Sequence, residues 1–340
     1  MSKLAKSEKA LLEVKGLSKH YDLTRGLFTK EKSVLRAVDD VSFSVYRGET
    51  FGIVGESGCG KSTTGNAILR LIEASKGEIW FDGEDLRRLS PEQMRMKRRD
   101  IQMIFQDPFS SLNPRMRVAD IIAEPLHAHK VAEGGDLKRR VAELMEIVGL
   151  SPTFAARYPH EFSGGQRQRI GIARALALQP KLIVCDEAVS ALDVSIQAQV
   201  LNLLMDLQRE FNLTYIFIGH GLPAVKYISD RIAVMYLGKI VEIADKNTLF
   251  KQPRHPYTAG LLASVPISDP SMREGRSRIV LEGDLPSPTN PPEGCKFHTR
   301  CPFATERCMT EEPPLADMSA DGHLAACHYP LNARESSVSA

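Results

Sequence analysis

Residues 55–62 combine glycine, lysine and serine at the spacing of a phosphate-binding loop. They fit the pattern GxxxxGK[ST], follow an apolar run at residues 50–54 that predicts a strand, and precede a helical pattern at residues 63–72. The glycines allow consecutive backbone N–H groups to turn toward an oxyanion, and the helix N-terminus adds positive charge. The alternative is a glycine-rich turn before an ordinary helix, and the full match of pattern and context favours phosphate binding. The predicted nucleotide-binding residues here are Gly55, Glu56, Ser57, Gly58, Cys59, Gly60, Lys61, Ser62 and Thr63.

Two adjacent carboxylates could carry hydrolytic chemistry. Asp186 follows an apolar run at residues 182–185, and Glu187 comes next. Such a pair repels itself at a strand end unless a cation or a reaction uses it. We predict that Lys61 reaches the β- and γ-phosphates, while Ser62 and Asp186 hold Mg²⁺. Glu187 would then polarise the water that attacks the γ-phosphate. The alternative is a structural pair that caps the next helix.

A second glycine turn, Ser163-Gly164-Gly165-Gln166, opens a helix predicted at residues 166–178. Its backbone N–H groups could also bind phosphate at a helix N-terminus. One chain cannot easily fold this turn onto its own phosphate loop if the two lie at separate edges. A dimer in which each nucleotide is closed by the turn of the facing subunit would explain why one chain carries both.

Composition restricts the class of protein. The chain has 340 residues, 43% of them hydrophobic and 25% charged, which is typical of a globular protein of one large or two modest domains. The net charge of +2 gives no argument for binding nucleic acid. No apolar run approaches the roughly 18 residues of a membrane span, and no secretion signal is recognised at the N-terminus. We therefore expect a cytoplasmic protein whose membrane role, if any, is played through partners.

The pattern of strands and helices predicts an α/β fold with a largely parallel sheet. A mainly helical insertion is expected between residues 118 and 178, and a long helix at residues 194–211. A hairpin is expected at Leu237-Gly238. The predicted strands cover residues 11–17, 41–46, 50–54, 77–81, 101–105, 182–185, 214–218, 231–236 and 239–243.

The C-terminal part is rich in proline and carries a cysteine cluster with the spacing Cys295-x5-Cys301-x6-Cys308-x18-Cys327. Disulfides are not expected in a reducing compartment, so the cluster suggests a metal. Four thiolates could hold a [4Fe–4S] cluster or a tetrahedral Zn²⁺, but the spacing matches neither common zinc signature. Four unligated thiols are the remaining alternative.

The ordered motifs together resemble the ATP-binding cassette (ABC) ATPases. Besides the loop, the carboxylates and the second glycine turn, the chain has Gln106, Ser190-Ala191-Leu192-Asp193 and His220 in the expected order. Three further stretches are similar to the ATP-binding subunits of dipeptide/oligopeptide permeases. They are residues 105–114, residues 254–258 and residues 283–288 with the cysteine tail.

The resemblance implies a role for each matching residue. Tyr21 would stack on adenine, although a half-buried tyrosine at a strand end is an equal alternative from the local sequence. Gln106 would contact Mg²⁺ and the attacking water, and His220 would bond the γ-phosphate and keep Glu187 aligned. Asp193 would lie at the dimer boundary. Ser163, Gly164, Gly165 and Gln166 would clamp the nucleotide of the opposing subunit. In permeases of this type the tail cysteines hold an iron–sulfur cluster, which favours [4Fe–4S] over zinc.

One motif departs from the family pattern. Gly219-His220-Gly221 stands where Ser-His-Asp is usual. Two glycines make the histidine loop more mobile, so we expect a competent but slower site.

The resemblance divides the chain into four parts. These are a disordered N-terminus at residues 1–10, an ABC nucleotide-binding domain at residues 11–253 with a helical subdomain at about 107–180, a permease-type C-terminal domain at residues 254–330, and a flexible tail at residues 331–340.

The implied function is ATP hydrolysis that drives import of dipeptides or oligopeptides. Alternatives are the same role for nickel or a sugar/opine-type cargo, or an ABC ATPase outside transport. Expected partners are a second, related ABC ATPase, two transmembrane permease subunits and, indirectly, a solute-binding protein outside the membrane. The protein would then lie at the cytoplasmic face of the inner membrane.

Overall fold

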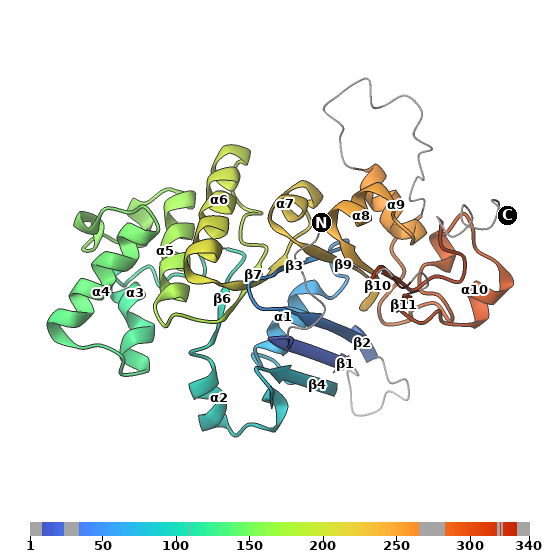
Figure 1. Ribbon diagram of the computed structural model, residues 1–340, viewed down its shortest axis with the longest axis horizontal. Coiled ribbons are helices and arrows are strands. Elements are labelled where there is room, and N and C mark those ends of the chain that lie inside the picture. The colour runs from blue at the N-terminus through green and yellow to red at the C-terminus, as the bar shows by residue number, and fades with distance from the viewer. Residues whose placement is uncertain are drawn as a thin grey trace. The chain divides into compact units, whose positions relative to one another are not determined.

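The computed structural model describes residues 9–23, 34–107, 109–264, 283–317, 320 and 322–331 (Figure 1). Residues 24–33, Pro108, Pro266, Pro270 and most of both predicted terminal tails lie outside these residues. The chain divides into two compact units. The helical unit comprises Met1–Glu13, Ser44–Thr50 and Trp80–Gly219, and the phosphate-loop unit comprises Val14–Phe43, Phe51–Ile79 and His220–Ala340.

The helical unit contains three parallel strands in the order β6 (Ile101–Ile104), β7 (Leu182–Asp186) and β8 (Thr214–Ile218). Strands β7 and β8 are buried at every residue, as expected for parallel strands covered on both faces. Their carboxyl ends therefore meet at one edge, which is where Asp186 lies. The expected parallel core is confirmed within this unit.

Helices α3 (Val118–Ala128), α4 (Gly134–Ile147) and α5 (Gly164–Leu176) form the predicted helical insertion (Figure 1). Their apolar residues recur with helical spacing and are buried, including Ile122, Leu144 and Ile170. The long helix α6 (Val194–Phe211) has the predicted bounds. Before β6, the short helix α2 (Pro91–Lys97) begins with Ser90 in a capping box and proline at its first position.

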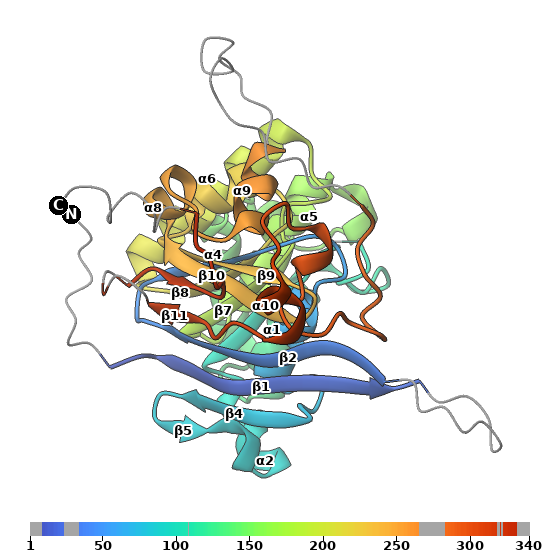
Figure 2. The same ribbon diagram turned by 90° about the vertical axis from the view of Figure 1, so that its right-hand side faces the viewer.

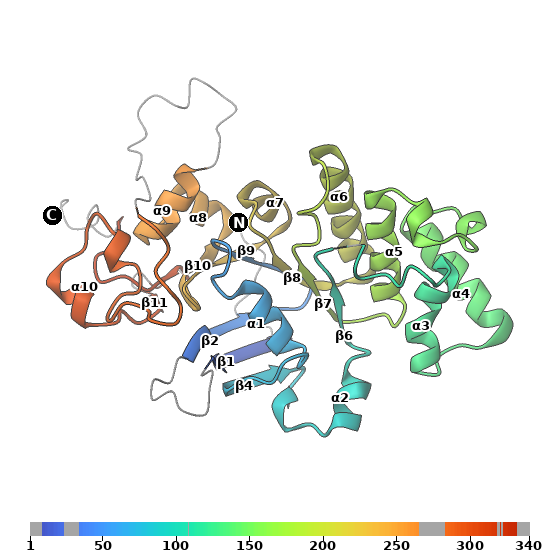
Figure 3. The same ribbon diagram turned by 180° about the vertical axis from the view of Figure 1, so that it is seen from behind.

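In the phosphate-loop unit, β3 (Thr50–Val54) runs parallel to β9 (Arg231–Tyr236). Strand β9 forms an antiparallel hairpin with β10 (Lys239–Asp245) through Leu237 and Gly238, which both have positive φ as this turn requires. The C-terminal strands β12 (Leu324–Ala325) and β11 (Ala316–Asp317) extend the sheet beyond β10 (Figure 3). The cysteine-rich segment is thus hydrogen-bonded into the unit that holds the phosphate loop.

A second sheet has four strands. Strands β2 (Val34–Val45), β1 (Leu12–Asp22) and β4 (Lys76–Phe81) run side by side in this order (Figure 2). The end of β4 pairs with β5 (Glu84–Asp85) in the helical unit, across a turn at Asp82 and Gly83. The remaining elements are short: α1 (Lys61–Ile68), η1 (Leu86–Arg88), η2 (Pro152–Phe154), η3 (Pro159–Glu161), α7 (Leu222–Ile228), α8 (Lys246–Lys251), α9 (Pro256–Ala263), η5 (His298–Arg300) and α10 (Glu306–Thr310).

Several predicted boundaries were wrong. Strands β1 and β2 are longer than predicted, because their polar halves gave no apolar alternation. Helix α1 begins at Lys61 and ends at Ile68, before residue 72, because Arg70 turns into the left-handed region with φ of 48°. Helix α5 begins at Gly164, earlier than predicted, because Ser163 caps it. Among the described residues, none of the helices has both the length and the apolar character needed to span a bilayer.

Candidate functional site

The phosphate loop joins the buried strand β3 to the N-terminus of α1, as predicted. Glycine is required at position 60, where φ is 104° and a Cβ atom would lie 2.1 Å from the Ala37 carbonyl oxygen. The Gly238 N–H donates to the Cys59 carbonyl at 2.9 Å, so the hairpin between β9 and β10 supports the loop from one side. Exposure is greatest at the apex, at Ser57 and Gly58, where a phosphate could approach.

Lys61 is buried and lies over the loop backbone. Its ammonium group donates to the carbonyl oxygens of Gly55 at 2.9 Å and Glu56 at 3.0 Å. Ser62 and Thr63 follow in the first turn of α1 and are both half-buried. Burial raises the pKa of Cys59, although Lys61 opposes this effect, so the thiol stays protonated at neutral pH. The loop therefore carries its positive charge on Lys61 and has no competing anion at position 59.

The carboxylate pair and Gln106 lie together in the helical unit. Asp186 is buried at the end of β7, and the Gln106 side-chain amide donates to Glu187 Oε2 at 2.8 Å. Glu187 has a positive φ of 46°, which is uncommon for a residue with a side chain and is tolerated where the surrounding structure holds the backbone. Its backbone is held by Ile218 and Ser190, with Glu187 N–H donating to the Ile218 carbonyl at 2.9 Å.

The alternative function of the pair, capping the next helix, is performed by another residue. Helix α6 is capped by Asp193, whose carboxylate accepts from the Ile196 N–H at 3.0 Å and the Ser195 hydroxyl at 2.9 Å. These hydrogen bonds hold the pKa of Asp193 below its usual value. Asp186 and Glu187 are thus left for a different role, while Asp193 has a structural role besides the one predicted at a dimer boundary.

The second glycine turn is a well-formed helix start. Ser163 accepts from the Gln166 N–H at 3.3 Å, and the Gln166 side chain accepts from the Ser163 N–H at 3.0 Å. Gly165 packs so tightly that a Cβ atom would lie 2.4 Å from Cγ2 of Ile196 in α6. The close packing sets α5 against the first turn of α6, and Ser163, Gly164 and Gln166 are half-exposed or exposed at this end.

His220 is exposed and begins the phosphate-loop unit, directly before α7. Gly221 precedes the helix and gives it no side-chain cap. Its alignment with Glu187 stays a prediction, because the two residues belong to different compact units.

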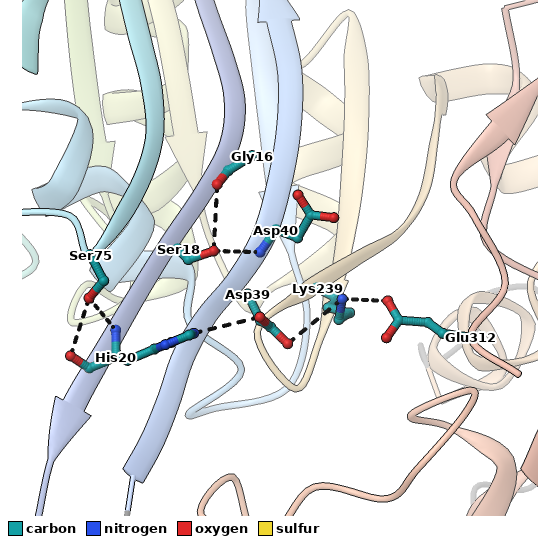
Figure 4. A network of polar contacts seen from close by, with 8 residues as sticks. All are labelled: Gly16, Ser18, His20, Asp39, Asp40, Ser75, Lys239 and Glu312. Carbon is teal, nitrogen blue, oxygen red and sulfur yellow. Dashed lines mark hydrogen bonds and ion pairs between the residues drawn. The ribbon is translucent and has the colours of Figure 1, made fainter. Parts of the chain in front are cut away.

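Tyr21 is half-buried near the end of β1. The Lys19 ammonium lies 4.7 Å from its ring centroid and is held by the Glu73 carbonyl at 2.8 Å. The neighbouring His20 bonds to Ser75 through its backbone N–H at 3.0 Å, and its ring nitrogen lies 3.6 Å from Asp39 (Figure 4). The backbone around Tyr21 is therefore held in place, and its ring has the Lys19 ammonium against it. Stacking on adenine stays a prediction.

The polar network around β2 continues into the C-terminal segment. Asp39 lies 3.7 Å from the Lys239 ammonium, which also pairs with Glu312 (Figure 4). This surface contact ties the segment before β11 to the β9–β10 hairpin.

The four tail cysteines line one pocket, together with His298, Phe303 and Tyr329. Burial, with repulsion from neighbouring cysteines, raises the pKa of Cys295 to about 11 and that of Cys327 to about 12. Across the ranges that the structure describes, however, no group of three or more His, Cys, Asp or Glu side chains is arranged to hold a metal ion. The structure places the four predicted cysteines around one pocket, but the expected metal geometry is not found among the described residues.

Sequence reasoning missed a buried charge. Glu242 of β10 is fully buried and accepts from the N–H groups of Arg254 at 2.7 Å and His255 at 3.0 Å, and from His323 Nε2 at 2.6 Å. The only signal available in the sequence was an acidic residue inside an apolar strand.

A phosphate loop after one strand, with a carboxylate pair and glutamine after two others, defines a P-loop nucleotide hydrolase. Residues 38–190 match the family model described as ABC transporter, and residues 241–308 match that described as oligopeptide/dipeptide transporter, C-terminal region. The chain belongs to the ATP-hydrolysing subunits of ABC transporters, in the group that carries the oligopeptide/dipeptide C-terminal region.

Individual relatives agree with this assignment over nearly their whole length. The oligopeptide transport ATP-binding protein AppF of Bacillus subtilis is 54% identical over 325 residues, which is 95% of this chain and 98% of AppF. OppF of Haemophilus influenzae is 52% identical, covering 95% of this chain and 98% of OppF. OppF of Escherichia coli is 52% identical, covering 93% and 95%.

Solved structures show the same fold. The ATP-binding cassette MJ0796, in a dimeric post-hydrolysis state bound to ADP and phosphate, matches with a TM-score of 0.61 and 29% identity. The match covers 69% of this chain and 98% of that one. The predicted ABC ATPase fold is confirmed.

Proposed function

We propose that the protein hydrolyses ATP to energise import of dipeptides or oligopeptides through a membrane permease. The observation that carries this proposal is the presence on one chain of both the ABC region and the oligopeptide/dipeptide C-terminal region. The names of the relatives, which are oligopeptide transport ATP-binding proteins, support peptides over nickel or sugar-type cargo.

The chain's own residues supply the binding and hydrolytic groups. Lys61 carries the charge that would meet the β- and γ-phosphates, and the N-terminus of α1 adds its dipole. Ser62, Gln106 and Asp186 would hold Mg²⁺, which when bound neutralises charge on the phosphates. Glu187, held by Gln106 at 2.8 Å, would orient and polarise the attacking water. His220 would keep the water and Glu187 aligned.

The second glycine turn argues for a dimer. Ser163, Gly164, Gly165 and Gln166 lie at a helix N-terminus that can bind anions, and Asp193 lies close by at the start of α6. We propose that this turn closes the nucleotide of a facing subunit, itself a related but distinct ABC ATPase. Two transmembrane permease subunits and an external solute-binding protein would complete the importer, with this chain at the cytoplasmic face of the membrane.

The cysteine pocket is proposed to hold a [4Fe–4S] cluster. Four cysteines around one pocket supply the donors that such a cluster uses, and burial raises the pKa of Cys295 and Cys327, so these two thiolates would be costly there without a cation. Anaerobically purified protein should show broad visible absorption with iron and sulfide in equal amounts. Zinc in a colourless protein would reverse the assignment.

Peptide uptake tests the transport function. Cells that lack the gene would be complemented with the wild type, Glu187→Gln or the matched control Glu210→Gln, which changes an exposed residue of α6. We expect labelled tripeptide uptake with the wild type and the control, and none with Glu187→Gln. Restoration of nickel or sugar uptake without peptide uptake would contradict the proposed cargo.

A further inference from the structure

Glu56, the second residue of the phosphate loop, is engaged at each of its polar groups. Its N–H donates to the Tyr257 hydroxyl at 3.0 Å, and its carbonyl accepts from Lys61 at 3.0 Å. Its carboxylate accepts from Arg300 Nη1 at 3.0 and 3.3 Å. Two of these three partners, Tyr257 and Arg300, come from the part of the chain that follows β10.

The contact with Arg300 lies largely out of water. The Arg300 side chain is 8% exposed and that of Glu56 is 26% exposed. An ion pair with this much shielding is screened less by salt than a surface pair, so it can hold the loop in one position. Because Lys61 is bonded to the Glu56 carbonyl, any shift of Glu56 also moves the ammonium group that would meet the phosphates.

Buried aromatic rings fix both partners. The ring centroids of Tyr257, Tyr236 and Phe297 lie 4.7 to 5.5 Å apart, and the Arg300 guanidinium lies 5.9 Å from the Tyr236 ring. Tyr236 ends β9, the parallel neighbour of the strand that leads into the loop. Burial, with the charge of Glu56, raises the pKa of Tyr257, so its hydroxyl keeps its proton.

Arg300 also follows the cysteines. It ends the short turn η5 and is directly followed by Cys301. The turn begins where the His298 N–H donates to the Cys295 carbonyl at 3.0 Å, and the Cys301 N–H closes it on His298 at 3.3 Å. The Cys295 N–H in turn donates to the Cys308 carbonyl at 2.9 Å. A few backbone hydrogen bonds therefore link the turn that ends at Arg300 to Cys295, Cys301 and Cys308.

We infer that Arg300 and Tyr257 are positioning residues for the phosphate loop, through which the cysteine-rich segment controls how tightly the protein holds ATP. The inference rests on the proposed ATP binding at this loop and adds a second region that regulates it. Because coupling between two sites is reciprocal, ATP at the loop also steadies the turn between Cys295 and Cys301.

Nucleotide affinity separates a positioning role from a merely structural one. MgATP dissociation constants would be measured on the full-length wild type and on Arg300→Ala, Arg300→Lys and Tyr257→Phe. The control is Arg307→Ala, since Arg307 pairs with Glu311 on the surface of the same segment. We expect Arg300→Ala to weaken MgATP binding about tenfold or more, as for loss of a shielded charged hydrogen bond. Arg300→Lys should recover part of the loss, and Arg307→Ala should leave binding unchanged.

Two outcomes overturn the inference. One is equal MgATP affinity in the Arg300→Ala and Arg307→Ala variants. The other is a loss of affinity that Arg300→Lys does not reduce at all. If the wild type itself binds no MgATP, or binds it no better than Lys61→Ala, the proposed function fails instead, so the two failures are distinguishable.

Hydrogen exchange tests the reciprocal direction without using activity. MgATP should slow amide exchange in residues 295–301 of the wild type, and this protection should be lost in Arg300→Ala. Protection that persists in the variant would show that the signal does not pass through Arg300 and would contradict the inference.

Discussion

Replacing Glu242 with Gln should destabilise the phosphate-loop unit strongly, although the change removes only a charge. The two carboxylate oxygens of Glu242 accept three hydrogen bonds, from Arg254, His255 and His323, and the side chain is fully buried. A glutamine has one acceptor oxygen, so its NH₂ group must face at least one N–H donor. One charge-assisted bond is lost, and two donors are left facing each other.

The size of the effect follows from these contacts. A hydrogen bond to a charged group contributes about 1.5–3 kcal/mol, and an orphaned buried donor costs about 1–3 kcal/mol. Removal of a buried charge offsets part of this cost. We therefore expect a loss of about 2–4 kcal/mol, which lowers Tm by roughly 5–12 °C in a domain of this size.

Thermal unfolding at a fixed scan rate measures the loss of stability, and amide hydrogen exchange at β12 reports it locally. The matched control is Glu312→Gln, which breaks the pair of an exposed carboxylate with Lys239 and should lower Tm far less. The combination of Glu242→Gln with His323→Asn should cost less than the sum of the single changes, because the two residues share one contact. A melting temperature for Glu242→Gln equal to that of Glu312→Gln would refute the reasoning.

Four other predictions test the site and its surroundings. Glu187→Gln should keep MgATP binding and lower its hydrolysis about 100-fold or more, and unchanged turnover would remove Glu187 from its role. Burial lowers the pKa of His255 from 6.5 to about 4 in the folded protein. As the pH falls, the unfolded chain therefore binds a proton at this histidine before the folded protein does. Stability should fall by about 3 kcal/mol between pH 6.5 and 4, and His255→Asn, which can still cap α9, should flatten this part of a urea-unfolding profile. Gly165→Ala should cost about 1–3 kcal/mol by clashing with Ile196, and Ile196→Ala should relieve the clash in a double-variant unfolding series. Cys301→Ser should abolish the visible absorption expected of a cluster, and unchanged spectra and iron content would exclude Cys301 as a ligand.

The sequence predicted best what depends on local pattern. Strands β8 and β9 and helix α6 have the bounds that apolar runs and Asp193 indicated. The phosphate loop was predicted from the spacing of its residues alone, because the backbone geometry of such a loop requires glycine at fixed positions. Strand β2 was predicted only in part, since its first half carries polar residues that pair with other segments rather than with a core.

Long-range contacts could not be predicted in the same way. The bond between Gln106 and Glu187 joins residues from two strands, and motif order alone gave no distance. The contact of Arg300 with Glu56 joins positions far apart in the chain, and nothing in the local pattern distinguishes Arg300 from the exposed arginines of the chain. The pairing of β10 with β12 rests on two residue pairs, too short a stretch for periodicity to reveal.

That short pairing has a practical consequence for anyone who wishes to shorten the protein. A truncation after residue 253 would look reasonable from the family pattern, yet it would uncover the outer side of β10, whose residues from Ile240 to Ala244 are buried. The bare backbone donors and acceptors of such a strand recruit other chains. The fragment would also keep Glu242 but lose its three hydrogen-bond donors. We expect it to precipitate, so the nucleotide-binding part should be produced together with its C-terminal segment.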